Sequence, residues 1–274
     1  MKTTDLSAGV SGNGAAAEVL PDFSLFPPEN PALFFKLMSY LLVIGGITPA
    51  ITIFMNVLNR TRITGRENLR GLRHRWILAS NHLTLLDDLF IGPLLIFPNS
   101  LKGYKYFPFH APEQRNFYKT PWIRWFMRQC KSVPIVRGRG VNQEGINYLI
   151  KAMKQGGILH IFPEGTRTRT GALGQGQPGV GRIVCESGAP VVPMYHQGLE
   201  RVLPIGSGVP RIGNEIRIFI GKPLRFQPEI QTGKESLVWR EVSSQIIEAI
   251  RCQKEIAEKT WGEKPLIVNN INKL

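Results

Sequence analysis

The longest hydrophobic pattern in the chain is an uncharged stretch from Leu37 to Asn59. Its length matches the roughly 20 apolar residues that a helix needs to cross a bilayer. Gly45, Gly46 and Pro49 lie near its centre, where they weaken helical hydrogen bonding. We therefore predict that residues 31–60 form a membrane-associating helical segment, bent into two half-helices within one leaflet. A single transmembrane span is one alternative. A buried core helix is the other, because length and lack of charge do not separate it from a membrane anchor.

After residue 60 the pattern changes to short apolar runs that alternate with helical stretches. The predicted strands are Trp76–Ala79, Val133–Val136, Ile158–Phe162, Val191–Tyr195 and Ile216–Ile220. The predicted helices are Gly145–Lys154, Arg182–Ser187 with Gly188 as C-cap, and a last amphipathic helix that includes Val238–Ile250. Such alternation is typical of an α/β fold. We expect residues 61–274 to form one domain with a mostly parallel central sheet covered by helices.

Residues 1–30 are rich in Gly, Ala, Ser and Pro. They are too polar to form a packed core and not basic enough for a secretory or transit peptide. We predict a disordered leader there.

The composition limits the classes of function. Hydrophobic residues make up 43% and charged residues 20%, which excludes a disordered chain and a multi-span membrane protein. The net charge of +14 favours anionic partners such as lipid headgroups, phosphorylated metabolites or nucleic acid. The three cysteines form no CxxC pair, which favours a reducing, cytosol-facing environment. His74, His110, His160 and His196 show no metal-ligand spacing, so we expect no metal and no cofactor.

Residues 101–140 combine nine Lys or Arg with a single acid and many aromatic side chains. This mixture is typical of nucleic-acid binding. It suits a membrane surface equally well, because aromatic rings lie at headgroup level and basic side chains bind anionic lipid. Since the chain also contains the uncharged run, we expect a membrane surface with anionic lipids as partner, and no nucleic acid.

The first candidate for chemistry is the segment Ser80–Asp88, directly after a predicted strand. If Asn81 caps a helix that begins here, His82 lies in its first turn and can fold back onto the Asp87 carboxylate. A histidine oriented by a carboxylate is a general base, since the carboxylate holds one tautomer and stabilises the imidazolium. A helix cap beside a surface histidine is the alternative.

A second motif, Phe162-Pro163-Glu164-Gly165-Thr166-Arg167, also directly follows a predicted strand. Ligands of open α/β sheets bind at strand ends, so we expect both motifs at one edge. Gly165 allows close backbone approach, Thr166 offers a hydroxyl, and Arg167 presents a planar fork that matches a phosphate. Glu164 is expected to accept a hydrogen bond from a substrate hydroxyl or to hold Arg167. A simple turn is the alternative.

His82-x4-Asp87 and Phe162–Arg167 resemble the first and third motifs of the glycerolipid acyltransferases, the family typified by 1-acylglycerol-3-phosphate acyltransferase. Val133–Gly138 and Val191–Met194 fall where that family has its second and fourth motifs. The resemblance covers about residues 63–224, and four motifs in order make it specific.

Within the family, the chain is most similar to the tafazzin-type phospholipid/lysophospholipid acyltransferases. The double acid Asp87-Asp88 and the stretch Arg137–Gly145 carry this likeness. Thr166-Arg167, in contrast, is similar to the lysophosphatidate enzymes. The acyl donor is therefore open between a phospholipid, acyl-CoA and acyl-carrier protein.

The resemblance implies the glycerolipid acyltransferase fold and an enzyme that moves a fatty acyl group onto the free glycerol hydroxyl of a lysophospholipid. His82 would be the base and Asp87 its orienter, with no covalent acyl-enzyme, and the chain has no Gly-x-Ser-x-Gly elbow. The acceptor would be bound by Arg137, Glu164, Gly165, Thr166 and Arg167. The alternatives are a lysophosphatidate-specific enzyme that uses acyl-CoA or acyl-carrier protein, and an inactive basic membrane-binding relative.

Overall fold

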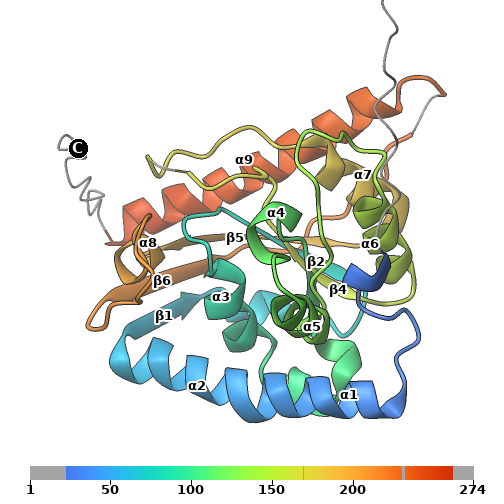
Figure 1. The fold of residues 1–274 in the computed structure, drawn as a ribbon. Coiled ribbons are helices and arrows are strands. Elements are labelled where there is room, and N and C mark those ends of the chain that lie inside the picture. The colour runs from blue at the N-terminus through green and yellow to red at the C-terminus, as the bar shows by residue number, and fades with distance from the viewer. Residues whose placement is uncertain (1–22, 169, 230–231, 262–274) are drawn as a thin grey trace, which may run out of the picture.

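The structure, a computed structural model, describes residues 23–168, 170–229 and 232–261 (Figure 1). Its centre is a six-stranded sheet in the order β1-β6-β5-β2-β4-β3. The strands are β1 Arg60–Thr64, β2 Trp76–Ser80, β3 Pro108–His110, β4 Ile158–Ile161, β5 Val191–Gln197 and β6 Glu215–Ile220. All neighbours pair in parallel except β5 and β6. The mostly parallel sheet predicted from the sequence is thus confirmed.

Helices cover both faces of this sheet. They are α1 Leu33–Tyr40, α2 Thr48–Ile53, α3 Asp87–Ile96, α4 Gln114–Phe117, α5 Pro121–Gln129, α6 Glu144–Lys154, α7 Pro178–Ser187, α8 Leu199–Val202 and α9 Glu235–Trp261. Side chains alternate along β2, because successive residues of a strand point to opposite faces. Ile77 and Ala79 pack with α6, α7 and α9, whereas Trp76 and Leu78 pack with α2 and α3. The two cores lie on opposite sides of one sheet.

Two predictions about strands need correction. Residues 133–136 form no strand; Ser132 and Ile135 make only isolated bridges, to His110 and Glu113. Pro134 has no N–H to donate to a ladder, which limits pairing there. In addition, the polar edge strand β1 and the three-residue β3 were not predicted, because neither has a run of apolar residues.

The apolar N-terminal segment is one continuous helix over Leu33–Leu58, not two half-helices. Its α-helical parts alternate with π-helical turns at Leu41–Ile47 and Phe54–Leu58. The backbone at Leu41, Thr48 and Phe54 stays in the right-handed helical region throughout. Gly45 and Gly46 lie within the first π-helical turn and Pro49 lies in the first turn of α2, and the break that the sequence predicted does not occur.

Among the described residues, this helix is long and apolar enough to cross a membrane by length and composition. It lies lengthwise along the lower side of the domain in Figure 1, opposite α9. Ser39, Thr48 and Met55 are buried against the domain, and the Ser39 hydroxyl donates to Gln129 of α5 at 2.6 Å. The π turns bring these unevenly spaced residues onto one face. Several other apolar side chains of the helix remain exposed, namely Leu33, Phe34, Leu37, Leu41, Ile53, Val57 and Leu58.

The predicted leader, residues 1–30, falls outside the described residues up to position 22. Residues 25–27 pack against the domain, so the prediction of disorder does not hold for them. Leu25 and Phe26 are buried, and the carbonyl oxygens of Phe26 and Pro27 accept hydrogen bonds from Arg128 and Tyr148.

Candidate active site

The catalytic histidine predicted from the sequence lies in the loop after β2, not in a helix. Helix α3 begins at Asp87, so residues 81–86 are free to curl around its side chain. The Asp87 carboxylate accepts hydrogen bonds from the backbone N–H of Leu83 at 2.7 Å, the N–H of Thr84 at 3.0 Å and the Thr84 hydroxyl at 2.6 Å. Its Oδ2 also lies 2.9 Å from Nδ1 of His82. The predicted pair is therefore present, in a tight loop.

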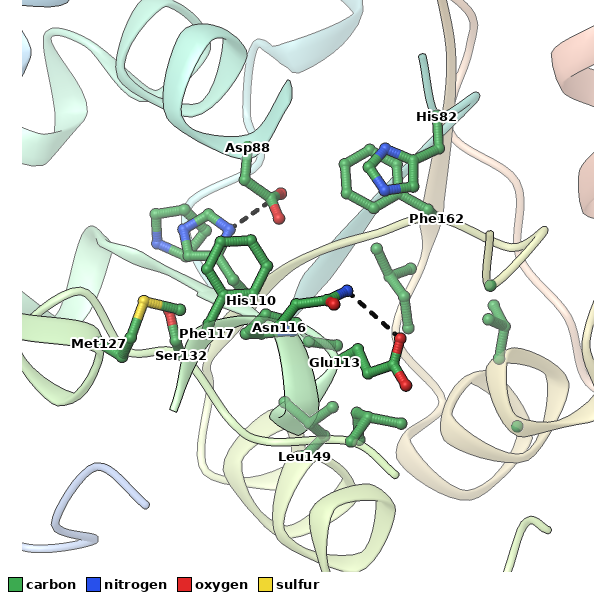
Figure 2. Close-up of a pocket in the computed structure, with 18 of the residues that line it drawn as sticks. His82, Asp88, His110, Glu113, Asn116, Phe117, Met127, Ser132, Leu149 and Phe162 are labelled. Atoms are coloured by element: carbon green, nitrogen blue, oxygen red, sulfur yellow. Dashed lines mark hydrogen bonds and ion pairs between the residues drawn. The ribbon is translucent and has the colours of Figure 1, made fainter. Parts of the chain in front are cut away.

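Two contacts hold the ring of His82. Asp87 binds Nδ1, and the ring of Phe162 stacks on the imidazole with centroids 3.9 Å apart and an angle of 10°. Figure 2 shows the two rings one above the other at the edge of a cavity. Nε2 makes no hydrogen bond with any described residue and is therefore available for proton transfer. Phe162 was part of the motif, but its stacking role depends on β2 and β4 being neighbours.

Asn81, which the sequence suggested as a helix cap, instead clamps β5. Its side-chain amide donates to the backbone carbonyl of His196 and accepts from the His196 N–H, both at 2.9 Å. The His196 ring in turn lies with Nε2 2.8 Å from the Asn81 carbonyl oxygen. This reciprocal clamp fixes the start of the His82 loop.

Asp87 remains ionised in this setting. Burial alone would raise the pKa of Asp87, but the charges of His196 and His82 and the hydrogen bonds from His82 and Thr84 outweigh burial and lower it. The anionic Asp87 is thus available to stabilise a proton on His82.

The Glu164 carboxylate points to backbone groups. It accepts hydrogen bonds from the N–H of Gly174 at 2.8 Å and from the N–H of His82 at 3.3 Å. Burial raises the pKa of Glu164, partly offset by these two bonds. The carboxylate therefore joins the loop after β4 to the loop after β2. Gly165 has φ +65°, and a Cβ there would lie 2.9 Å from Gln177, so glycine is required in this turn.

The His82 loop borders a cavity of about 840 Å³ between α3, the 107–118 segment and α5–α7. Its lining is mostly apolar, and Met127 lies away from His82 in Figure 2. Gly165, Thr166, Arg167 and Arg137 line the same cavity as His82. All of the site residues that the sequence suggested thus line one cavity, except Asp87, which is fully buried and reaches the cavity only through His82.

The two cavity arginines differ in their surroundings. Arg137 pairs with Glu113, with Nε 3.2 Å from the carboxylate oxygen. Arg167 has no ion-pair partner among the residues that the structure describes. The next residue, Thr168, donates its backbone N–H to the His82 carbonyl oxygen at 2.9 Å, so the backbone at Arg167 lies close to His82. An unpaired guanidinium at this position can bind an anion such as a phosphate.

Residues 60–197, half of the chain, match the model of the Acyltransferase family. The chain therefore belongs to this acyltransferase family. It is an acyltransferase of the glycerolipid type.

Individual relatives within the family are tafazzins and 1-acyl-sn-glycerol-3-phosphate acyltransferases. The chain is 29% identical to tafazzin of Drosophila melanogaster over 254 residues, which cover 88% of this chain and 67% of that protein. It is 34% identical to taffazin of Dictyostelium discoideum over 171 residues, 57% of this chain and 56% of that protein. It is also 32% identical to the chloroplastic 1-acyl-sn-glycerol-3-phosphate acyltransferase BAT2 of Brassica napus over 167 residues, 60% of this chain and 45% of that protein.

The fold is that of the 1-acyl-sn-glycerophosphate acyltransferase PlsC from Thermotoga maritima, with a TM-score of 0.59 at 20% identity. The likeness covers 82% of this chain and 87% of that one. Together with the sequence relatives, it describes a glycerolipid acyltransferase similar to tafazzins.

Proposed function

We propose that this protein transfers a fatty acyl group onto the free glycerol hydroxyl of a lysophospholipid, with His82 as general base. The observation that carries the proposal is the His82–Asp87 pair at the edge of an apolar cavity, with Nε2 unoccupied. Nε2 takes the hydroxyl proton while the hydroxyl oxygen attacks the acyl carbonyl carbon. The imidazolium, stabilised by Asp87, then returns the proton to the leaving group.

Direct attack by the acceptor hydroxyl is favoured over a covalent acyl-enzyme. Cys130 lines the cavity and is the obvious thiol to consider. Burial raises its pKa to about 12, so the thiolate needed for attack is scarce at neutral pH. His82 faces no serine or cysteine at hydrogen-bond distance among the described residues.

The cavity and Arg167 suggest how the acceptor and donor bind. The mostly apolar lining suits an acyl chain. Arg167 beside His82 suits the phosphate of the acceptor, which would place the neighbouring glycerol hydroxyl near Nε2. Glu164 acts on the acceptor indirectly, through the two loops that it joins.

The test is acyl transfer to a labelled lysophospholipid by purified protein. We expect His82→Ala to lower turnover by about 10²–10⁴-fold, the usual contribution of a general base. Asp87→Asn should lower it similarly, because an amide sets the wrong tautomer. His74→Ala, which changes an exposed histidine, is the control. Normal turnover by a folded His82→Ala protein would disprove the mechanism.

The acyl donor needs its own experiment. A phospholipid donor leaves a glycerol alkoxide, which the His82 imidazolium can reprotonate, and the reaction is then nearly isoenergetic and reversible. We expect measurable acyl exchange between a diacyl phospholipid and a lysophospholipid without any CoA. Thiol release from acyl-CoA that depends on lysophospholipid, with no exchange when CoA is rigorously absent, would reject this donor.

That second outcome would support the other candidate, a lysophosphatidate acyltransferase that uses acyl-CoA or acyl-carrier protein. Two observations favour it as the alternative: the Thr166-Arg167 pair in the motif, and the similarity to proteins named 1-acyl-sn-glycerol-3-phosphate acyltransferases.

We also propose that the N-terminal helix lies in the plane of a membrane, on the side where the cavity meets the helix. Val43 and Ile47 of the helix line the cavity, so lipid can reach the site from there. The outward side chains are apolar and exposed, namely Leu33, Phe34, Leu37, Leu41, Ile53, Val57 and Leu58. A helix packed lengthwise on the domain cannot cross a bilayer without taking the domain with it. A cytosol-facing domain and an anionic lipid surface agree with the net charge of +14.

A further inference from the structure

A second group of titratable side chains lies beside the catalytic pair. Asp88 is in the first turn of α3, next to Asp87 but pointing elsewhere. His110 ends β3 and His160 lies in β4, where the two are register partners in a parallel pair. Their side chains therefore leave the same face of the sheet, the face that α3 covers. The mechanism proposed above uses none of the three.

The three side chains converge on one point. Oδ1 of Asp88 lies 2.7 Å from Nδ1 of His160 and 3.0 Å from Nδ1 of His110. All three ligand atoms lie within 4.8 Å of one another. Figure 2 shows Asp88 and His110 pointing toward each other at the cavity wall.

Asp88 lies at ion-pair distance from both imidazoles, but none of these contacts has the geometry of a well-directed hydrogen bond. Asp88 Oδ1, His110 Nδ1 and His160 Nδ1 are all buried and have no hydrogen-bond partner among the described residues. The side chain of His160 is only 1% exposed, whereas Asp88 and His110 reach the cavity. Buried polar atoms normally have well-directed hydrogen bonds, and three metal-ligand atoms that face one another without them can instead share one cation.

We propose that Asp88, His110 and His160 bind a divalent transition-metal ion such as Zn²⁺. Two imidazoles and one carboxylate suit Zn²⁺ better than Mg²⁺ or Ca²⁺, which prefer oxygen ligands. Tetrahedral Zn²⁺ places its ligand atoms about 3.3 Å apart, so the present distances need to widen by a few tenths of an ångström.

The surroundings fit a metal site with one open position. Ser80 Oγ lies 2.9 Å from Nε2 of His160, the kind of outer partner that orients a metal-binding imidazole. Asp88 and His110 line the same cavity as His82. Three protein ligands leave a fourth position directed at the cavity, where an oxygen atom of water or of a bound ester or phosphate can coordinate.

The experiment measures metal binding by the untagged full-length protein, after removal of metal with a chelator and without any lipid. Co²⁺ is titrated and followed by its visible absorption, and Zn²⁺ is then added as competitor and counted by mass spectrometry. The variants are Asp88→Asn, His110→Gln and His160→Gln. His74→Gln is the matched control, because it removes an exposed histidine that is not part of the cluster.

We expect one Zn²⁺ per chain for the wild type and the control, and loss of binding in the three ligand variants. Ser80→Ala should weaken binding about 10-fold or more, as outer-partner changes do. His110 is less buried than His160, so His110→Gln and Asp88→Asn test the site even if His160→Gln does not fold.

The proposal is wrong if the wild type binds no Zn²⁺ in the micromolar range, or if folded Asp88→Asn and His110→Gln bind it like the control. In that case the three side chains form a hydrogen-bonded array without metal. Because no acyl substrate is present, the result is independent of whether acyl transfer is the correct function.

Discussion

Two arginines line the cavity among the described residues, and their neighbours predict different roles. Arg137 already pairs with Glu113, and nearly half of its side chain is exposed. Arg167 lies beside His82 without an ion-pair partner in the described part of the chain. At the scale of single residues, acceptor binding should therefore depend on Arg167 more than on Arg137, although the sequence suggested both.

Replacement of Arg167 by lysine keeps the charge but removes the planar fork that matches a phosphate. We expect the apparent KM for the lysophospholipid to rise about 10-fold, the value of one charge-assisted hydrogen bond, with little change in the KM for the donor. Arg137→Lys, the matched comparison, should change the acceptor KM less. Steady-state kinetics with each substrate varied in turn provide the measurement. Equal effects of Arg167→Lys on both substrates would indicate a structural role instead.

At the scale of elements, the N-terminal helix has one face packed against the domain and another face of exposed apolar side chains. Ser39, Thr48 and Met55 face the domain, and the exposed apolar residues face outward. Each fully buried leucine contributes about 1.5–3 kcal/mol of transfer free energy, so the outward face favours membrane binding strongly.

We expect the double variant Leu37→Glu/Leu41→Glu to lose binding to anionic vesicles in a flotation assay while its Tm stays near that of the wild type. The matched control is Leu237→Glu, an exposed leucine on α9, on the opposite side of the domain. Wild-type flotation by the double variant would show that another surface binds the membrane.

The orientation of the helix is checked in the same preparation with cysteines at positions 36 and 60. Cys252 is exposed and is replaced by serine, whereas burial raises the pKa of Cys130 to about 12 and of Cys185 to about 11, which keeps both slow to react. An in-plane helix leaves both new cysteines accessible from one side of sealed vesicles. Labelling from opposite sides would contradict this orientation.

At the scale of the whole molecule, the cavity joins elements that are far apart in the sequence, from the N-terminal helix to α7. Its walls come from the N-terminal helix, α3, the 107–118 segment, α5, α6 and α7. Since these elements surround a mostly apolar volume of about 840 Å³, the length of the acyl chain is limited by the far wall.

Met127 lines the cavity away from His82, and Met127→Trp places a larger side chain there. We expect kcat/KM for long-chain acyl donors to fall several-fold while short-chain donors are little affected, at a cost of about 1–3 kcal/mol in unfolding free energy from overpacking. A chain-length series of donors provides the measurement, and urea unfolding provides the control for stability. A uniform loss for all chain lengths would mean that the acyl chain lies elsewhere.

The sequence by itself determined the local features of this protein. The His82-x4-Asp87 spacing was enough to predict the pair, because a loop of four residues keeps the two side chains within reach. The apolar runs predicted β2, β4, β5 and β6, because buried parallel strands are continuously hydrophobic. Gly188 was predicted as a C-cap, and its φ of +62° confirms it, because the left-handed conformation favours glycine.

Only the tertiary structure decided which distant residues meet. Glu164 binds the backbone of His82 because β2 and β4 are neighbours, and a strand order is not encoded in any short motif. The grouping of Asp88, His110 and His160 depends on the same order, with α3 above β3 and β4, so spacing along the chain contained no sign of it. The continuity of the N-terminal helix was likewise decided by packing, since contacts with the domain and two π turns outweigh the local effect of glycine and proline.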